Sequence, residues 1–469
     1  MSQPFTYISH SDVRELRGPL LVLGDVAKVG WDEYAVVDVE SPGGLTDERH
    51  GLVLEVDHDL VTLQVLEGTD AMYAGGVQVR FAGQPLQIPV GTNWLGRTCN
   101  GRGEPLDGGP PPVTGDTTMP LHGWPLNPVQ REPPAEPVIT GISVIDALNT
   151  LVRGQKLPIF SLPGMPHLTL ATQIAAQATS RGRPFRVVFA AMGLTHADIY
   201  YVRDRLEERS AAGELVLLLN AADDPVIERL LTPKIALTVA EHLAYTEGDD
   251  VLVIMSDMTS YAEALREVSA ARREIPARRG YPGYLYSDLA SLYERCGRIR
   301  GHEGSVTIVP VLTMPGGDIT HPVPDLTGYI TEGQIVLSAE IEARGVYPPV
   351  DILSSLSRLM RSGAGAGRTR EDHLDAAAQA LSAMARARQA AELSELVGAD
   401  SLSETDRRYV AFRSHLEQEV LSQGTSEFRS LEETLGRAWS ALGTLPRREL
   451  TMVSTELLDR YLPLPRSGP

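Results

Sequence analysis

Several apolar runs in the middle of the chain, none of which alternates with polar residues, restrict the fold more than any other feature of the sequence. Amphipathic stretches separate these runs, which occupy residues 157–160, 185–190, 215–219, 251–255 and 306–312. A strand that is apolar on both faces has to be covered on both faces, and such strands alternating with helices are typical of a mostly parallel sheet. The sequence therefore predicts an α/β core between about residues 139 and 359.

The first 75 residues have a different pattern, in which short apolar runs alternate with turn signals. The runs lie at residues 20–23, 34–39, 51–56 and 60–66. Ser41-Pro42-Gly43-Gly44 separates one pair of runs, and Asp57-His58-Asp59 separates another. This spacing predicts a small antiparallel β-barrel. Residues 95–137, which are rich in glycine and proline, are expected to form a connector without a core of its own.

The chain is predicted to become helical after the glycine-rich segment 363–367. Apolar residues recur there at helical spacing, in two stripes made of Tyr409, Phe412, Leu416 and Val420 and of Leu431, Leu435, Trp439 and Leu442. Ser403 and Asp406 have the spacing of a capping box before the first stripe. We therefore expect three domains, with a barrel at 1–75, an α/β domain at 76–365 and a helical bundle at 366–469.

Composition and charge limit the possible partners. The formal net charge of -19 opposes binding to nucleic acid or to anionic lipid. The two cysteines, Cys99 and Cys296, have no metal-ligand spacing and fit a reducing, cytoplasmic setting. No apolar run reaches the roughly 18 residues that a membrane-spanning helix needs, so any link to a membrane is expected to run through other chains.

The segment 157–178 has the order strand, loop, helix that holds nucleotide phosphates in P-loop and RecA-like folds. A working loop needs several glycines, a lysine for the β and γ phosphates, and a hydroxyl for magnesium. This loop has one glycine, Gly164, while Pro163 and Pro166 lack an amide hydrogen and His167 lies near the expected lysine position. The loop is therefore predicted to be degenerate and unable to hold a triphosphate tightly.

Two interpretations of this loop stay open, a decayed nucleotide site and a plain strand-to-helix connection that never used ATP. A second absence favours decay, because the turn after the run 185–190 lacks the carboxylate that would polarise an attacking water. Asp257 follows the run 251–255 and has two possible roles. It either holds a magnesium-bound water or, more commonly for such an acid, caps the next helix.

Long and unusual motifs relate the chain to a known family. They are TGISVID at 140–146, LVRGQKLPIF at 151–160, RRGYPGY at 278–284, PDLTGYITEGQ at 324–334, SSLSRLM at 354–360 and TREDH at 369–373. Through them the chain closely resembles the B subunits of V/A-type ATPases and ATP synthases, over nearly its whole length. In that family a degenerate phosphate loop in this subunit is itself a common trait.

The resemblance implies a non-catalytic, regulatory subunit at the cytoplasmic face of a membrane, coupled to proton or sodium transport. Three such chains would alternate with three catalytic A subunits, which would hold ATP or ADP with Mg²⁺, and the ring would contact central rotor and peripheral stalk subunits. It also implies that Arg358 acts in trans as an arginine finger on the nucleotide of the neighbouring A subunit. A guanidinium suits this role because it stays charged and offers a fork of donors to phosphate oxygens.

Other assignments compete with this one. The alternative function is a catalytic P-loop-type motor ATPase that acts on nucleic acid or export substrates, and a purely structural spacer is a further alternative. Arg358 could also be a surface arginine paired with a carboxylate. Arg278 and Arg279 would line a subunit interface, face the shaft or form a solvated edge. For His302, His321 and His373, core or capping roles are expected and metal ligation is not.

Overall fold

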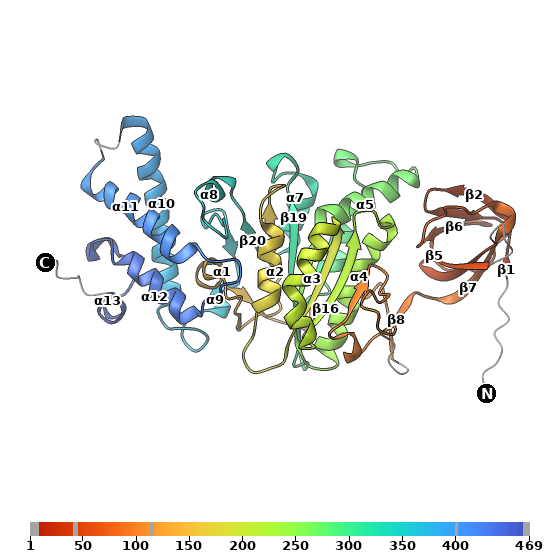
Figure 1. Cartoon of the computed structure of the whole chain (residues 1–469), viewed down its shortest axis with the longest axis horizontal. Coiled ribbons are helices and arrows are strands. Elements are labelled where there is room, and N and C mark those ends of the chain that lie inside the picture. The colour runs from red at the N-terminus through yellow and green to blue at the C-terminus, as the bar shows by residue number, and fades with distance from the viewer. Residues whose placement is uncertain (1–8, 41–45, 113–116, 399–401, 463–469) are drawn as a thin grey trace.

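The computed structural model describes residues 9–40, 46–112, 117–398 and 402–462, which form three bodies along one long axis (Figure 1). A curled β-sheet lies at one end, an α/β body occupies the middle, and helices fill the other end. This order confirms the predicted fold class.

The first body is a seven-stranded sheet with the strand order β1-β7-β4-β5-β6-β3-β2, in which every neighbouring pair is antiparallel. Its strands are β1 (Ser9–His10), β2 (Val13–Arg17), β3 (Leu20–Leu23), β4 (Glu33–Glu40), β5 (Thr46–Asp57), β6 (Leu60–Val65) and β7 (Val77–Pro85). The expected turn at residues 57–59 joins β5 to β6, with His58 at a φ of 55°. The turn expected at residues 41–44 lies outside the described residues.

The second body contains the predicted parallel sheet, with the order β21-β20-β14-β19-β17-β15-β16-β9. The strands are β9 (Thr98–Asn100), β14 (Ile159–Ser161), β15 (Phe185–Leu194), β16 (Leu215–Ala221), β17 (Asp250–Ser256), β19 (Ser305–Thr313), β20 (Gly333–Val336) and β21 (Leu356–Ser357). Neighbours from β20 to β9 are parallel, and only β21 runs antiparallel to its neighbour along this order. The run 157–160 forms β14 only from Ile159, because Pro158 has no amide hydrogen to donate.

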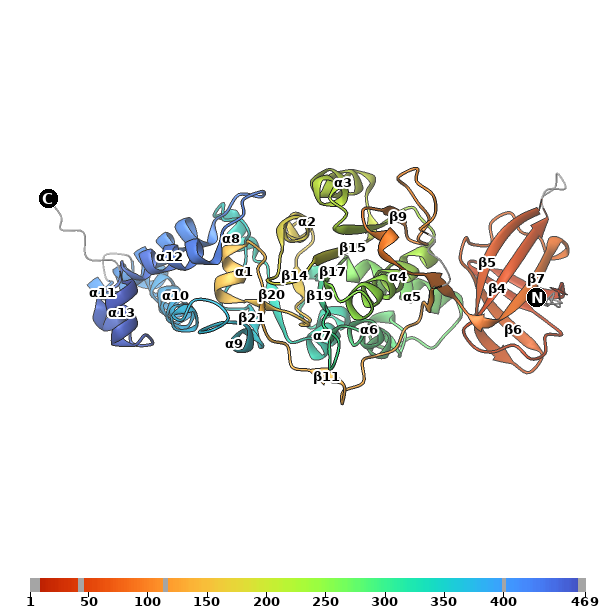
Figure 2. The same ribbon diagram turned by 90° about the horizontal axis from the view of Figure 1, so that it is seen from below.

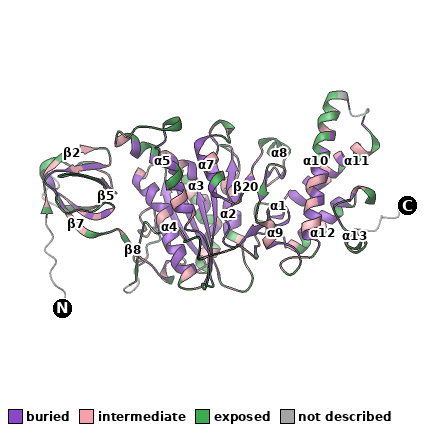
Figure 3. Ribbon diagram, turned by 180° about the vertical axis from the view of Figure 1, so that it is seen from behind, coloured by how far each residue is buried: buried purple, intermediate pink, exposed green. Residues whose placement is uncertain are grey.

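Helices cover both faces of this sheet (Figure 2). On one face lie α2 (His167–Gln177) and α3 (His196–Ala211), and on the other lie α4 (Val226–Tyr245), α5 (Met258–Ala271), α6 (Leu285–Tyr293) and α7 (Pro322–Ile330). Along β15, Val187 and Phe189 belong to the first core, whereas Val188 and Ala190 belong to the second. Figure 3 shows the resulting burial of the central strands, among them β16, β17 and β19. Burial on both faces is the reason why the strand sequences do not alternate.

The third body is the predicted group of helices. It contains α10 (His373–Val397), α11 (Glu404–His415), α12 (Leu431–Leu442) and α13 (Thr455–Tyr461), and the short α1 (Ser143–Leu148), α8 (Ala339–Ala343) and α9 (Met360–Gly363) lie where the sheet domain meets it. The expected cap is present, since the Ser403 hydroxyl accepts from the Asp406 amide at 3.1 Å. The first apolar stripe starts on α11 and continues through a π-helical segment, Leu416–Leu421, so that all four of its residues stay buried.

The glycine-rich connector is held to both the barrel and the sheet by charge. Arg102 lies 3.3 Å from Glu67, which follows β6, and 3.3 Å from Glu228 of α4. Glu228 is almost fully buried, and this burial raises its pKa from 4.5 to about 7 even though Arg102 opposes the shift. The folded chain therefore binds a proton at Glu228 more tightly than the unfolded chain does.

This shift predicts how stability depends on pH. Because the folded pKa is the higher one, the contribution of Glu228 to the free energy of unfolding is complete below about pH 4.5 and is lost as the pH rises to about 7. Glu228→Gln should remove that part of the pH dependence. Parallel denaturant titrations of the two proteins between these pH values would measure it, and identical pH profiles would contradict the prediction.

Candidate functional site

The degenerate loop lies at the carboxyl end of β14, where a nucleotide site would be expected. The backbone amides of Met165 and His167 donate within the loop, to the carbonyls of Leu162 and Met165 at 3.3 and 2.8 Å. Gly164 has a φ of +85° but is the single glycine of the loop. Since these donors are used internally, the loop offers few amides to an anion.

His167 is the first residue of α2 and lies near the position expected for the phosphate-binding lysine. Its ring Nδ1 lies 3.3 Å from the Ser161 hydroxyl, so the imidazole points back to the end of β14. The side chain is thereby engaged with its own loop, which agrees with the predicted degeneracy.

Asp257 acts as a helix cap. Its carboxylate accepts from the Thr259 amide at 2.7 Å, at the start of α5, and from the Thr313 hydroxyl at 2.7 Å. Burial raises the pKa of this carboxyl group, while these hydrogen bonds and His167 oppose the shift. Of the two roles considered for Asp257, the geometry supports the structural one. Over the residues that the structure covers, no group of three His, Cys, Asp or Glu side chains is arranged to hold a metal ion.

The polar groups around the turn after β15 are engaged in hydrogen bonds within the chain. The Gly193 amide donates to the Asn220 side chain at 3.1 Å, and the same oxygen accepts from Arg229 at 2.9 Å. The carboxylate of Asp198 is used at the start of α3, where it accepts from the Thr195 hydroxyl at 2.7 Å.

Arg358 follows the edge strand β21 and is exposed. Its backbone amide donates to the Glu332 carbonyl at 3.1 Å, and its guanidinium Nη1 donates to the Thr331 carbonyl at 3.2 Å. In the described part of the chain, no carboxylate lies within ion-pair distance of this guanidinium, which argues against a paired surface arginine. Nearby Asp325 instead pairs with Arg278 at 3.2 Å.

A surface hollow of about 280 Å³ lies beside Arg358, lined by Phe160, Ile319, Thr320, Pro324, Asp325, Gly328, Tyr329, Gln334 and Arg358. Three large apolar side chains near it are strongly exposed, namely Ile319 at 44%, Tyr329 at 73% and Leu356 at 53%. A free cation among exposed apolar side chains is typical of a surface that another protein covers.

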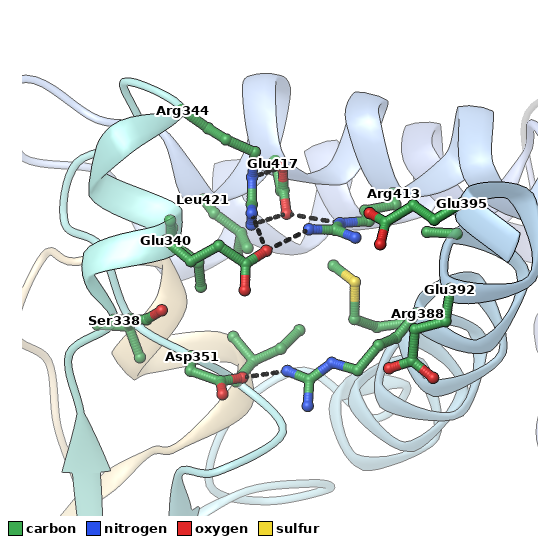
Figure 4. Close-up of a pocket in the computed structure, with 15 residues that line it drawn as sticks. Ser338, Glu340, Arg344, Asp351, Arg388, Glu392, Glu395, Arg413, Glu417 and Leu421 are labelled. Carbon is green, nitrogen blue, oxygen red and sulfur yellow. Dashed lines mark hydrogen bonds and ion pairs between the residues drawn. The ribbon is translucent and has the colours of Figure 1, made fainter.

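A larger hollow, of about 460 Å³, lies where the sheet domain meets the helices (Figure 4). On one side Arg344 and Arg413 both contact Glu417, at 2.8 and 3.0 Å, and on the other side Arg388 contacts Asp351 at 2.9 Å. Each arginine facing this hollow is therefore already neutralised by a carboxylate. This arrangement joins two domains and leaves no cationic site for a phosphate.

The remaining candidate residues have structural partners. Arg279 pairs with Asp318 at 2.6 Å, and Arg278 with Asp325, so both form exposed ion pairs. His302 contacts the Tyr245 carbonyl at 2.9 Å, and His373 is buried and contacts the Ala147 carbonyl at 2.9 Å. His321 is buried, and its ring forms a T-shaped pair with the ring of Tyr281, with the centroids 5.5 Å apart. No helix in the described ranges is both long and apolar enough to cross a membrane.

Family models match all three bodies of the chain. The model described as "ATP synthase alpha/beta family, nucleotide-binding domain" matches residues 141–357, and the model of the β-barrel domain of the same family matches residues 13–83. The model described as "C-terminal domain of V and A type ATP synthase" matches residues 362–462.

Individual proteins agree with these models. The chain is 52% identical over 461 residues to the B-type subunit of the A-type ATP synthase of Aeropyrum pernix, covering 98% of each chain. It is also similar to a solved structure, the ATP synthase subunit NeqB from Nanoarcheaum equitans, with a TM-score of 0.70 and 36% identity over 88% of this chain and 100% of the other.

Proposed function

The chain belongs to the ATP synthase alpha/beta family as a B-type subunit of the A/V class, and from this premise we propose that it is the non-catalytic partner of a nucleotide-holding subunit. In this proposal, three copies alternate with three catalytic A subunits. ATP or ADP with Mg²⁺ is held mainly by the A subunit, and Arg358 reaches that nucleotide across the interface.

The contrast between Arg358 and the loop carries this proposal. The loop at residues 162–166 has no lysine, and the amides of Met165 and His167 donate within it, whereas Arg358 is exposed and free of carboxylates among the described residues. The loop thus lacks the lysine that would bind the phosphates of a nucleotide held by this chain. Arg358, by contrast, offers a cation on the exposed surface where we expect the neighbouring subunit to bind. An exposed guanidinium of this kind can stabilise the charge that spreads over the phosphate oxygens during transfer.

The proposal extends to the rest of the complex. A subunit of an ATP synthase has partner subunits, and we assign to this chain contacts with the central rotor and peripheral stalk subunits. It would lie at the cytoplasmic face of the membrane and take part in proton or sodium transport only through those partners.

A comparison of the isolated chain with the reconstituted complex tests whether the partner subunit, and not this chain, holds the nucleotide. The isolated chain should show no ATP turnover and should bind labelled ATP weakly, because its loop cannot grip a triphosphate. Turnover should appear when the partner subunits are added. Tight magnesium-dependent ATP binding and turnover by the isolated chain would instead support the rival assignment, a motor ATPase that is catalytic by itself.

A further inference from the structure

We propose that Gln155, a buried glutamine far from Arg358 in sequence, positions Arg358 for its contact with the neighbouring nucleotide. This inference rests on the proposed function. Gln155 touches neither nucleotide nor solvent, so it is a positioning residue and not a catalytic one.

Gln155 is fully buried in the segment between β13 (Leu151–Val152) and β14. Its side-chain oxygen accepts from the Val152 amide at 2.9 Å, which fixes the orientation of the side-chain amide. The Nε2 group then donates to the Glu332 carbonyl at 3.1 Å and to the Ser357 hydroxyl at 3.0 Å. One side chain therefore bridges the two segments that hold Arg358.

Gln155 is linked to the backbone of Arg358 through a shared acceptor, the Glu332 carbonyl. The Glu332 carbonyl that accepts from Gln155 also accepts from the Arg358 amide, at 3.1 Å. Ser357, the residue before Arg358, is held a second time because its hydroxyl donates to the Thr150 carbonyl at 2.9 Å. Gln155 thus contacts the carbonyl that accepts from the Arg358 amide and the side chain of the residue before Arg358.

The edge of the sheet needs this support because β21 is only two residues long. It pairs with β20 alone, through Gly333 opposite Ser357 and Gln334 opposite Leu356. Gly333 has a φ of +133°, and a Cβ atom there would lie 2.0 Å from the Leu356 carbonyl oxygen. The two strands therefore approach closely, and few backbone hydrogen bonds are available to keep the Arg358 segment in place.

The consequence for the reaction follows from geometry. An arginine that stabilises a transition state acts only when its donors meet the phosphate oxygens, and a misplacement of about 1 Å can cost about 10²-fold in rate. Loss of the Gln155 bridge should therefore lower kcat. It should leave KM for ATP nearly unchanged, because the neighbouring subunit holds the nucleotide.

The test compares Gln155→Leu with the wild-type full chain, each reconstituted with its partner subunits. Leucine keeps most of the side-chain volume and removes the hydrogen bonds to the Glu332 carbonyl and the Ser357 hydroxyl. We expect kcat to fall by about 10- to 100-fold with KM for ATP close to wild type. Gln379→Leu is the matched control, since Gln379 is 2% exposed and its hydrogen bonds go to Glu449 and Met452 in the helical domain. The control should retain wild-type kcat.

A double substitution separates positioning from general damage. In a chain that already carries Arg358→Ala, adding Gln155→Leu should lower kcat no further, because no guanidinium remains to be positioned. A further loss of the same size would overturn the inference. So would a wild-type kcat for Gln155→Leu in a complex that responds to Arg358→Ala.

The two proposals fail in different ways. If Arg358→Ala itself leaves turnover unchanged, the proposed function of Arg358 is wrong. If Gln155→Leu does not assemble, Ser357→Ala replaces it, because this small change removes the hydroxyl that Gln155 and Thr150 hold. The same drop in kcat and the same lack of effect on top of Arg358→Ala are then expected, and wild-type kcat for Ser357→Ala would overturn the inference.

Discussion

Arg358→Ala is expected to lower ATP turnover of the reconstituted complex by about 10³-fold or more while the complex still assembles. Among the described residues, the guanidinium donates to the Thr331 carbonyl and has no carboxylate partner. Its removal therefore breaks little inside the subunit. The whole effect should appear where negative charge develops on the transferred phosphoryl group, and steady-state ATP hydrolysis with size-exclusion analysis of assembly would measure it.

Two further variants define what Arg358 contributes. Arg358→Lys keeps the charge but loses the planar fork of donors, so it should restore only part of the lost turnover. Arg361→Ala is the matched control, because Arg361 is another exposed arginine three residues further along the chain. Full turnover in Arg358→Ala would make Arg358 an ordinary surface residue and would favour the structural spacer. An equal loss in Arg361→Ala would show that the effect is not specific to Arg358 and would contradict the arginine-finger assignment.

The sheet could be predicted from sequence because each central strand is buried on both faces. Residues 187–190 of β15 divide between the two cores, and this is visible in the sequence as an unbroken apolar run. The barrel and the helices were predictable for a similar reason, since their periodicity follows burial on one face. The π-helical segment 416–421 was not predicted, because the stripe that crosses it keeps an ordinary helical spacing in the sequence.

The degeneracy of the loop is predicted from the sequence alone, because it depends on residue types that are missing from the loop. For Asp257 the sequence favoured a helix cap over a magnesium site but left both roles open, and the structure shows the cap, with the Thr259 amide 2.7 Å from the carboxylate. The additional hydrogen bond from Thr313, 56 residues further along the chain, could not be predicted from the sequence.

The positioning of Arg358 could not be read from the sequence at all. Gln155 contacts Glu332 and Ser357, which lie 177 and 202 positions away in the sequence. Nothing in the sequence around either residue indicates this contact. Gly333 gave no signal either, because the close approach to Leu356 arises only when β20 and β21 pair. Local sequence patterns thus predict the helices and strands, whereas the position of Arg358 depends on hydrogen bonds between residues that are far apart in the sequence.

Arg295→Met should lower the free energy of unfolding by about 3–5 kcal/mol, because it leaves a buried carboxylate without its partner. The Arg295 side chain is 1% exposed and contacts Glu241 of α4, itself 9% exposed, at 2.7 Å. The same guanidinium donates to the Thr238 hydroxyl at 2.8 Å and to the Leu121 carbonyl at 3.2 Å, so it also fastens the connector to α4. Denaturant titration followed by tryptophan fluorescence would measure the loss, since Trp94 lies in the same side of the core.

The double variant Arg295→Met with Glu241→Leu separates two contributions to the free energy of unfolding. One is the cost of a buried carboxylate without a partner, and the other is the net stabilisation by the ion pair. Replacing both partners by apolar groups removes the uncompensated charge, so most of the lost stability should return. If the double variant is as unstable as Arg295→Met alone, the hydrogen bonds to Thr238 and Leu121 carry the stability instead. If Arg295→Met is as stable as wild type, the ion pair contributes nothing to the free energy of unfolding. We therefore expect Arg295→Met to have the lowest free energy of unfolding of the three proteins and the double variant to lie closer to wild type. This order is expected only if Arg295 compensates the buried charge of Glu241 while it holds the connector against α4.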